Sequence, residues 1–327
     1  MPVRPEGAQD PASRIEQIIS AQEAGFIRAF LDAVAGIVGT ATLVQLEELL
    51  MQGRVEEALE ALDSASAALG SQYGQSFTEA ARDTARFLSQ TALTVTVAFD
   101  QTNTRAVSAI SRNQLRLTRE FNAEQRRATR RALQDGITRG INPRDQARQF
   151  RQSIGLTERQ MASVERFRHL LTDGRAGNLP SRTVLDRALR DGRFDRTILR
   201  SIRDNVPLTA EQVDKMIERY AQRFLQYRAE VIARTEALRS THEGVDEMYR
   251  QAVDLGQIDP RGLRRTWVTA GDERVRASHA RLNGIEQPLG EPWQADAGPL
   301  MFPGDPNAPA SETVQCRCII STRVSPV

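Results

Sequence analysis

A long run of helix-forming residues occupies the first two thirds of the chain. Ala, Leu, Glu, Gln and Arg dominate this part, and all five have favourable helix propensities. Apolar residues recur in it at helical spacing, which would place them on one face of each helix. The sequence therefore predicts a mainly helical body, with helices over residues 13–38, 42–52, 54–69, 75–100 and 103–133.

Two further helices are predicted from matching start motifs. Thr157 precedes Gln160 by three residues, and Thr209 precedes Gln212 in the same way. A Thr at the N-cap with Gln three residues later is a capping box, in which each side chain accepts the other's backbone N–H. We expect a helix to begin at each motif, and the apolar spacing to continue to Leu255.

The composition changes after Leu255, where Gly and Pro become frequent. Short β-like runs at 265–269 and 316–321 predict strands. Between them we expect a short helix over 272–282 and a long loop over 288–311. The predicted fold class is α+β, with a long mainly helical N-terminal body followed by a small C-terminal α+β module.

Length favours more than one domain, because the chain has 327 residues and domains usually have about 100–200. We predict a helical region over 1–150, a second helical region over 151–255 and the α+β module over 256–327. A hydrophobic content of 40% is too high for wholesale disorder.

Several protein classes are excluded by simple patterns. Two cysteines cannot build a disulfide framework. The first residues lack the basic-then-apolar order of a secretory signal. The uninterrupted apolar stretch over 33–44 is shorter than the roughly 20 residues that a membrane span needs. We therefore expect a protein that is assembled in the cytoplasm and has no membrane partner.

Charge is distributed unevenly, although the formal net charge is only +2. Residues 105–240 hold 29 basic and 16 acidic residues, whereas residues 1–104 hold 6 and 14, and residues 241–327 hold 9 and 12. A basic block in the middle of the chain indicates a polyanionic or acidic partner for that stretch.

Within this block, arginines recur along one predicted helix. Residues three and four apart share a helix face, so they form a stripe that could contact DNA phosphates. Few aromatic residues interleave the stripe, so any DNA contact would be independent of sequence. The alternative is a solvated or protein-docking face, which is the more common role of a charge run. The candidate residues are Arg116, Arg119, Arg126, Arg127, Arg130 and Arg131.

The last third of the chain carries an ordered set of motifs. They are Ala233-Arg234-Thr235-Glu236, Trp267 with Thr269, Asp272 with Arg274-Val275-Arg276, His279, Gly284 and Cys316-Arg317-Cys318. In this order and spacing, about residues 155–322 resemble the phage head-morphogenesis family named for the F protein of phage Mu. Residues 1–150 show no such resemblance.

The resemblance implies a structural minor capsid protein of a tailed bacteriophage, without enzymatic activity. Such a protein would bind the portal protein, the major capsid protein or the inner head, and would assist head assembly, DNA packaging or DNA ejection. It would reside in the virion head. The region over 1–150 would dock to the portal or capsid, or face the packaged DNA.

The main alternative is an ADP-ribosyltransferase-like effector carried in the virion, because the minor-head fold is thought to resemble such enzymes. These enzymes need a glutamate, usually within a Glu-x-Glu pair, and the chain has no Glu-x-Glu. Nucleotide-binding glycine loops, GxSxG and HExxH are also missing from the sequence. We therefore predict no catalytic residue.

The two cysteines have two interpretations. On a strand, Cys316 and Cys318 would point to the same face, and a disulfide between them is implausible because their Cα atoms would be poorly aimed. Together with His279 they could bind zinc, with His242 or Asp272 as a fourth ligand. The more common role is that of small buried hydrophobic residues, so we expect no cofactor other than this zinc.

The remaining motif residues have structural interpretations. Arg234 lies four residues before Leu238 on the apolar helix face, and a buried arginine needs an acidic partner. We expect Asp272 to be that partner, because Glu236 does not share a face with Arg234. Trp267 should lie in the core of the small module.

Overall fold

The computed structural model describes most of the chain. The described residues are 10–40, 67–91, 96–138 and 154–325, with a few single residues between these ranges. Most residues of the predicted helices over 42–52 and 54–69 lie outside the described residues.

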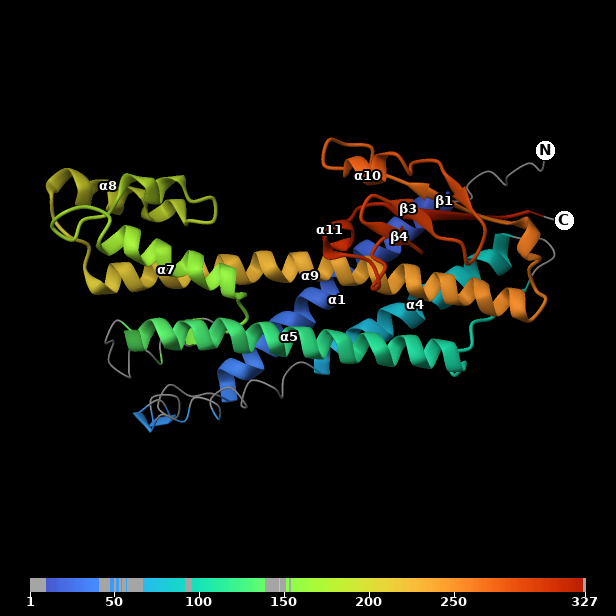
Figure 1. The fold of residues 1–327 in the computed structure, drawn as a ribbon, viewed down its shortest axis with the longest axis horizontal. Helices are drawn as coiled ribbons and strands as arrows, with labels where there is room; N and C mark the ends of the chain where they lie inside the picture. The colour runs from blue at the N-terminus through green and yellow to red at the C-terminus, as the bar shows by residue number, and fades with distance from the viewer. Residues whose placement is uncertain are drawn as a thin grey trace. The chain divides into compact units, whose positions relative to one another are not determined.

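Long helices make up most of the described chain (Figure 1). They are α1 (Pro11–Thr40), α4 (Ala67–Thr91), α5 (Thr104–Thr138), α7 (Glu158–Thr172) and α9 (Ala210–Asp254). The shorter ones before the sheet are η2 (Arg182–Asp186), η3 (Gly192–Phe194), α8 (Asp195–Asp204) and η4 (Pro260–Gly262). The predicted fold class is confirmed, since a mainly helical body precedes a small α+β module. Among the described residues, no helix is long and apolar enough to cross a membrane.

Both capping boxes form as predicted. The Thr157 side chain accepts the Gln160 N–H at 3.2 Å, and the Gln160 side chain accepts the Thr157 N–H at 2.9 Å. Thr209 and Gln212 make the same pair at 3.2 and 3.0 Å. Each box satisfies N–H groups that a helix start leaves without partners, so α7 and α9 begin where the sequence predicts.

Three helix boundaries differ from prediction. α4 begins at Ala67 and runs without interruption through residues 70–74, where the sequence predicts a break between two helices. α4 ends at Thr91 and does not continue to residue 100. β-branched residues lose side-chain freedom in a helix, and Val97 instead exchanges hydrogen bonds with the Ser89 side chain, at 2.9 and 3.2 Å. α5 continues to Thr138, because a single glycine such as Gly136 costs a helix only about 1 kcal/mol.

The chain divides into two compact units, each built from segments far apart in sequence. The first unit comprises residues 1–30, 67–117 and 230–327, and the second comprises 31–66 and 118–229. This grouping differs from the predicted consecutive regions, because α1, α5 and α9 each contribute residues to both units.

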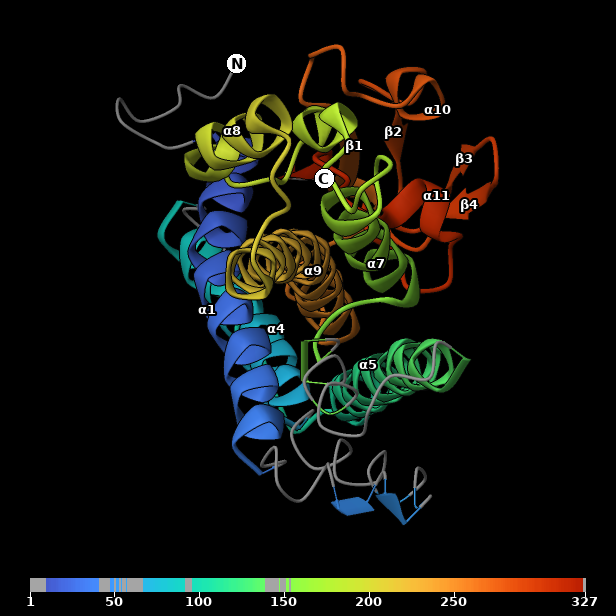
Figure 2. The same cartoon turned by 90° about the vertical axis from the view of Figure 1, so that its left-hand side faces the viewer.

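In the first unit, α1 and α4 lie side by side (Figure 2). Polar side chains join them, with Arg14 bonded to Asp83 at 2.6 Å and Gln22 bonded to Glu79 at 2.7 Å. The core of this unit includes the buried side chains of Phe26, Tyr73, Phe77, Leu238, Met248, Trp267 and Trp293. Helical and sheet residues therefore share one core in this unit.

α4 approaches α9 closely at Gly244. A Cβ atom placed on Gly244 would lie 2.3 Å from the carbonyl oxygen of Phe77. Real Cβ atoms do not approach a backbone oxygen this closely, so the packing of these two helices requires glycine here.

The small module contains two antiparallel sheets. The first has strand order β2-β1-β5, formed by β2 (Glu286–Gln287), β1 (Leu263–Val268) and β5 (Ile319–Val324). In its register, Trp267 pairs with Ile320. The second is a hairpin of β3 (Trp293–Ala295) and β4 (Gly298–Leu300).

Three local predictions for this module are wrong. Only α10 (Ala277–Ala280) is helical within 272–282, and the supposed loop over 288–311 contains the β3–β4 hairpin and the start of α11 (Ala310–Thr313). Cys316 and Cys318 precede β5 and do not lie on it. The reason is local, because Gln315 adopts a positive φ of 54° directly after α11, which interrupts the extended backbone that a strand needs.

In the second unit, α7 packs against the first half of α9 (Figure 1). The ring of Phe167 stacks on Tyr220 with centroids 4.1 Å apart, and Phe224 meets Tyr220 edge-on at 5.0 Å. Nearby, the buried Arg228 donates to the Gly155 carbonyl at 2.7 Å. Aromatic packing therefore carries much of this smaller core.

Candidate metal centre

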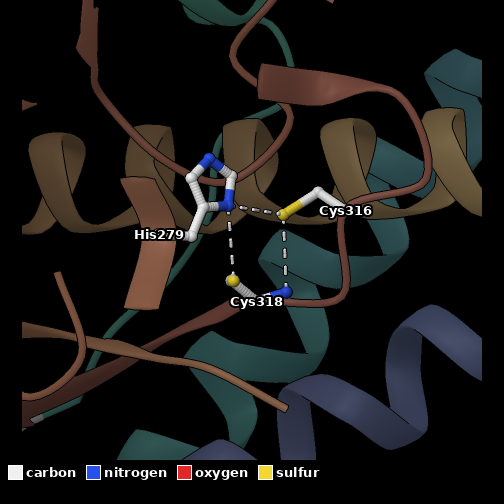
Figure 3. A group of neighbouring side chains, drawn as sticks. All are labelled: His279, Cys316 and Cys318. Carbon is white, nitrogen blue, oxygen red and sulfur yellow. Dashed lines mark hydrogen bonds between the residues drawn. The ribbon is translucent and has the colours of Figure 1, made fainter. Parts of the chain in front are cut away.

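His279, Cys316 and Cys318 come together inside the first unit. His279 lies in α10, and the two cysteines lie in the segment between α11 and β5. Each sulfur is 3.5 Å from His279 Nδ1, and the three ligand atoms all lie within 4.8 Å of one another. Figure 3 shows the ring nitrogen directed at both sulfurs. All three residues are buried, with at most 3% of their surface exposed.

The intervening Arg317 fixes the cysteine segment from outside. Its guanidinium makes a two-pronged ion pair with Asp272, with both N–O distances 2.5 Å. Arg317 thereby lowers the pKa of the Asp272 carboxyl to about 2. Arg276 donates to the Val314 carbonyl at 2.5 Å. The loop before α10 is therefore tied to the loop that carries both thiols.

Glu312 lies behind the histidine ring, on the side away from the sulfurs. Its Oε2 is 2.9 Å from His279 Nε2, within ion-pair distance, although the alignment falls short of a hydrogen bond. Ser278 donates to the same carboxylate at 2.9 Å, and the Ala297 N–H donates at 3.3 Å. A carboxylate behind a histidine is the arrangement that orients metal-ligating histidines, because it fixes the proton on the outer nitrogen.

The pKa values of the two thiols are shifted in opposite directions. The pKa of the Cys316 thiol is lowered to about 5, because the Cys318 thiol donates to it and His279 lies beside it. The pKa of the Cys318 thiol is raised by the same neighbour and by burial. Cys316 therefore favours the thiolate form, which is the form that binds metals.

Two sulfurs and one imidazole nitrogen form a donor set suited to zinc. Both fourth ligands that the sequence suggests are occupied. His242 donates from Nδ1 to the Leu238 carbonyl at 2.9 Å and accepts the Ile320 N–H at Nε2 at 3.1 Å, and Asp272 is held by Arg317. The protein thus offers three donors here, and a fourth position would be filled by water or another small ligand.

This centre lies within the part of the chain that a known family matches. Residues 182–321 match the family described as Phage Mu protein F like protein. We call residues 182–321 the Mu F-like segment. The match confirms the resemblance over the C-terminal half of the chain, although it begins at residue 182 and not at the predicted residue 155. It supports the coarse assignment to phage head morphogenesis, with a place in the virion among other head proteins. Comparison with curated proteins and with solved structures returns no match.

Other motif residues of the Mu F-like segment have structural partners. Arg234 pairs with Glu23 of α1 at 2.7 Å, so its predicted pairing with Asp272 is wrong. The physical reason is that Arg234 faces α1, whereas Asp272 lies in an exposed turn beside Arg317. Trp267 is fully buried, as predicted, and meets the His279 ring edge-on at 5.2 Å.

Glu236 is a buried link between elements of the first unit. One carboxylate oxygen accepts from Arg116 of α5 at 2.7 Å, and the other accepts from Arg239 at 2.7 Å. Arg239 also donates to the Gly304 carbonyl at 2.7 Å. Both oxygens of this motif residue are therefore held by arginines.

Two residues important to this module were missed by sequence reasoning. Glu312 carries no signal, because it lies in the four-residue helix α11, which is too short to show helical periodicity in the sequence. Arg265 does carry a signal in the sequence, since it is two residues from both Leu263 and Trp267 and therefore shares the inward face of β1 with them. Its side chain is 3% exposed and bonds to Asp246 at 3.0 Å. It also donates to three carbonyl groups, those of Pro288, Glu291 and Met301.

The arginines of the predicted stripe on α5 do not share one environment, because some are held in ion pairs and others are exposed. Arg116 belongs to the first unit, where its ion pair with Glu236 directs it inward. The other five residues belong to the second unit, where Arg131 pairs with Glu158 at 3.0 Å. Arg119, Arg127 and Arg130 are exposed. DNA contact by this stripe stays a prediction for those exposed residues.

Proposed function

We propose that this protein is a non-enzymatic minor capsid protein of a tailed bacteriophage that binds the portal protein inside or at the head. The Mu F-like match over residues 182–321 is the observation that carries this proposal. In this role the protein would assist head assembly, DNA packaging or DNA ejection. The occupied carboxylate of Glu236 favours this role over ADP-ribosyl transfer, since such an enzyme needs a free glutamate.

The test is association with assembled heads. The tagged protein should co-purify with heads that contain the portal, and its amount should fall sharply in heads assembled without the portal. Equal amounts in both would contradict portal binding. Failure to find the protein in either would refute the head assignment, and transfer of ADP-ribose from NAD to any head or host protein would support the enzyme alternative.

We also propose that His279, Cys316 and Cys318 bind one zinc ion. The Glu312 carboxylate behind His279 supports this, because it orients the ring nitrogen towards both thiols. Bound zinc would supply a fixed tetrahedral junction between α10 and the start of β5. In this role the metal is structural, and it would hold together the two sides of the small module.

Elemental analysis of the purified protein should find about one zinc per chain. His279→Ala should abolish binding, and Glu312→Gln should weaken it by about 10–100-fold. His169→Ala is the matched control, since that histidine is exposed, and it should retain the metal. A metal-free wild-type protein that also fails to take up added zinc would refute the site.

A further inference from the structure

A depression of about 340 Å³ lies where α8 ends and α9 begins, within the second unit. Its lining includes Arg196, Arg200 and Asp204 from α8, together with Val206, Pro207 and Leu208 from the connection to α9. The charge of Asp204 is balanced by its ion pair with Arg203. We call the two arginines and the three apolar residues the 196–208 surface. It is separate from the metal centre and from the arginine stripe on α5.

The apolar part of this surface is displayed by a fixed backbone. Val206 is 59% exposed, yet its N–H donates to the Ser201 carbonyl at 3.1 Å and its carbonyl accepts the Ser201 hydroxyl at 2.6 Å. Asn205 ends α8 in the left-handed conformation. The backbone that carries Val206 is therefore already ordered before a partner binds, which lowers the entropy cost of binding.

Two cations lie beside the apolar residues. Arg196 and Arg200 are one turn apart and share a face of α8. Among the described residues, neither makes an ion pair within 4 Å, whereas Arg203 next to them pairs with Asp204 at 2.7 Å. The pKa of the Asp204 carboxyl is lowered mainly by Arg203, and Arg200 adds a weaker electrostatic effect from farther away. The 196–208 surface thus combines available positive charge with exposed apolar side chains.

This combination distinguishes between two kinds of anionic partner. A DNA backbone could meet the arginines, but phosphates and sugars offer little apolar surface to cover the exposed Val206 and Pro207. Protein interfaces have an apolar centre and are enriched in arginine. An acidic protein segment that carries an apolar side chain satisfies both parts of the surface.

We propose that the 196–208 surface docks an acidic segment of another head protein, with an apolar side chain of that segment seated against Val206. Glutamate or aspartate residues of the partner pair with Arg196 and Arg200. The proposal rests on the proposed function only in naming the partner as a head protein. The surface itself is made by residues of this protein alone.

The test uses a synthetic peptide in which leucines are flanked by glutamates. The full-length protein should bind it, and the double variant Arg196→Glu with Arg200→Glu should weaken binding by about tenfold or more. Val206→Ser should weaken it similarly, because it removes the apolar contact. Arg175→Glu is the control, since Arg175 is an exposed arginine of the same unit that does not line the depression, and it should change the affinity by less than about twofold. Unchanged melting temperatures will show that each variant is folded.

Two results would overturn the docking site. One is absence of peptide binding, or equal binding by wild type and all variants. The other is binding of duplex DNA that the arginine variants abolish and Val206→Ser leaves intact, since this would assign the surface to phosphates. The same variants are then tested on assembled heads. If wild type associates with heads and the variants associate equally, the docking site fails while the proposed function stands; if wild type does not associate, the proposed function fails.

Discussion

Arg265 shows how a single buried side chain can organise irregular backbone. Its guanidinium lies 4.8 Å from the centre of the Trp293 ring, and it bonds to one carboxylate and three carbonyl groups. Only arginine offers five donors in a planar fork. The loops of the small module are thus arranged around one charge that is balanced chiefly by Asp246.

We predict that Arg265→Met destabilises the first unit by about 3–5 kcal/mol, because carbonyl groups and Asp246 lose their buried donor. Urea denaturation measures the free energy of unfolding. Arg264→Met is the matched control, since the neighbouring side chain points outward, and it should stay within about 0.5 kcal/mol of wild type. Equal stability of the two variants would show that Arg265 is not the organising residue.

Residue-scale chemistry was only partly predictable. A meeting of His279 with the two cysteines was one of two interpretations of the sequence, the other being that the cysteines are buried hydrophobic residues, and the structure brings the three side chains together. The actual partners of Arg234 and Asp272 could not be inferred, since they depend on which helix face meets α1. Glu312 was missed because it lies in α11, a helix of only four residues that leaves no periodic pattern in the sequence.

At the scale of helices, the contact of α4 with α9 at Gly244 leaves no room for a side chain. We predict that Gly244→Ala destabilises the protein by about 1–3 kcal/mol, because the helices must separate to relieve the contact with the Phe77 carbonyl. Gly39→Ala in α1 is the control. Among the described residues, nothing outside the backbone of α1 itself and the chain neighbours of Gly39 lies within 4 Å of the position that its Cβ would take. This change should therefore be neutral or slightly stabilising. Thermal unfolding compares the two, and a neutral Gly244→Ala would contradict the tight packing.

Glu243 joins three helices and should make stability depend on pH. It accepts hydrogen bonds from Tyr73 of α4 and from Asn113 of α5. Burial raises the pKa of its carboxyl from 4.5 to about 7, although Tyr73 and the nearby Arg112, Arg239 and Arg116 act in the opposite direction. The folded state therefore binds this proton more tightly than the unfolded state.

Stability from this proton is fully present below about pH 4.5 and is lost as pH rises through about 7. Between these pH values, the free energy of unfolding of the wild type should fall by about 3 kcal/mol because of Glu243. We predict that the Glu243→Gln variant does not show this fall. The measurement is the difference in unfolding free energy between wild type and variant at several pH values. A difference that does not change with pH would show that Glu243 titrates normally.

Most helices were predictable from sequence, whereas the small module was not. The starts of α7 and α9 were found because capping boxes are local signals. The β3–β4 hairpin was taken for loop, because its strands are three residues each and too short for an alternating pattern. The cysteine segment was placed on a strand because the positive φ of Gln315 has no marker in the sequence.

At the scale of the whole molecule, the compact units are discontinuous in sequence. The module over 256–327 shares its core with residues from α1, α4 and the second half of α9. We predict that the fragment 256–327 does not fold alone, because Trp267 and Trp293 would lose their helical neighbours. Proton–nitrogen NMR spectra should show poor dispersion for the fragment and good dispersion for the full chain. A cooperatively unfolding fragment would contradict this prediction.

The ion pair between Arg234 and Glu23 has a consequence for folding kinetics. It joins residues 211 positions apart in the sequence, whereas the core over Leu156 to Ala221 is assembled from one continuous stretch. Contacts between distant residues form slowly, because loop-closure entropy must be overcome first. We therefore expect the second unit to acquire its core early. The first unit, although largely helical, should fold later and at a rate more typical of a β protein.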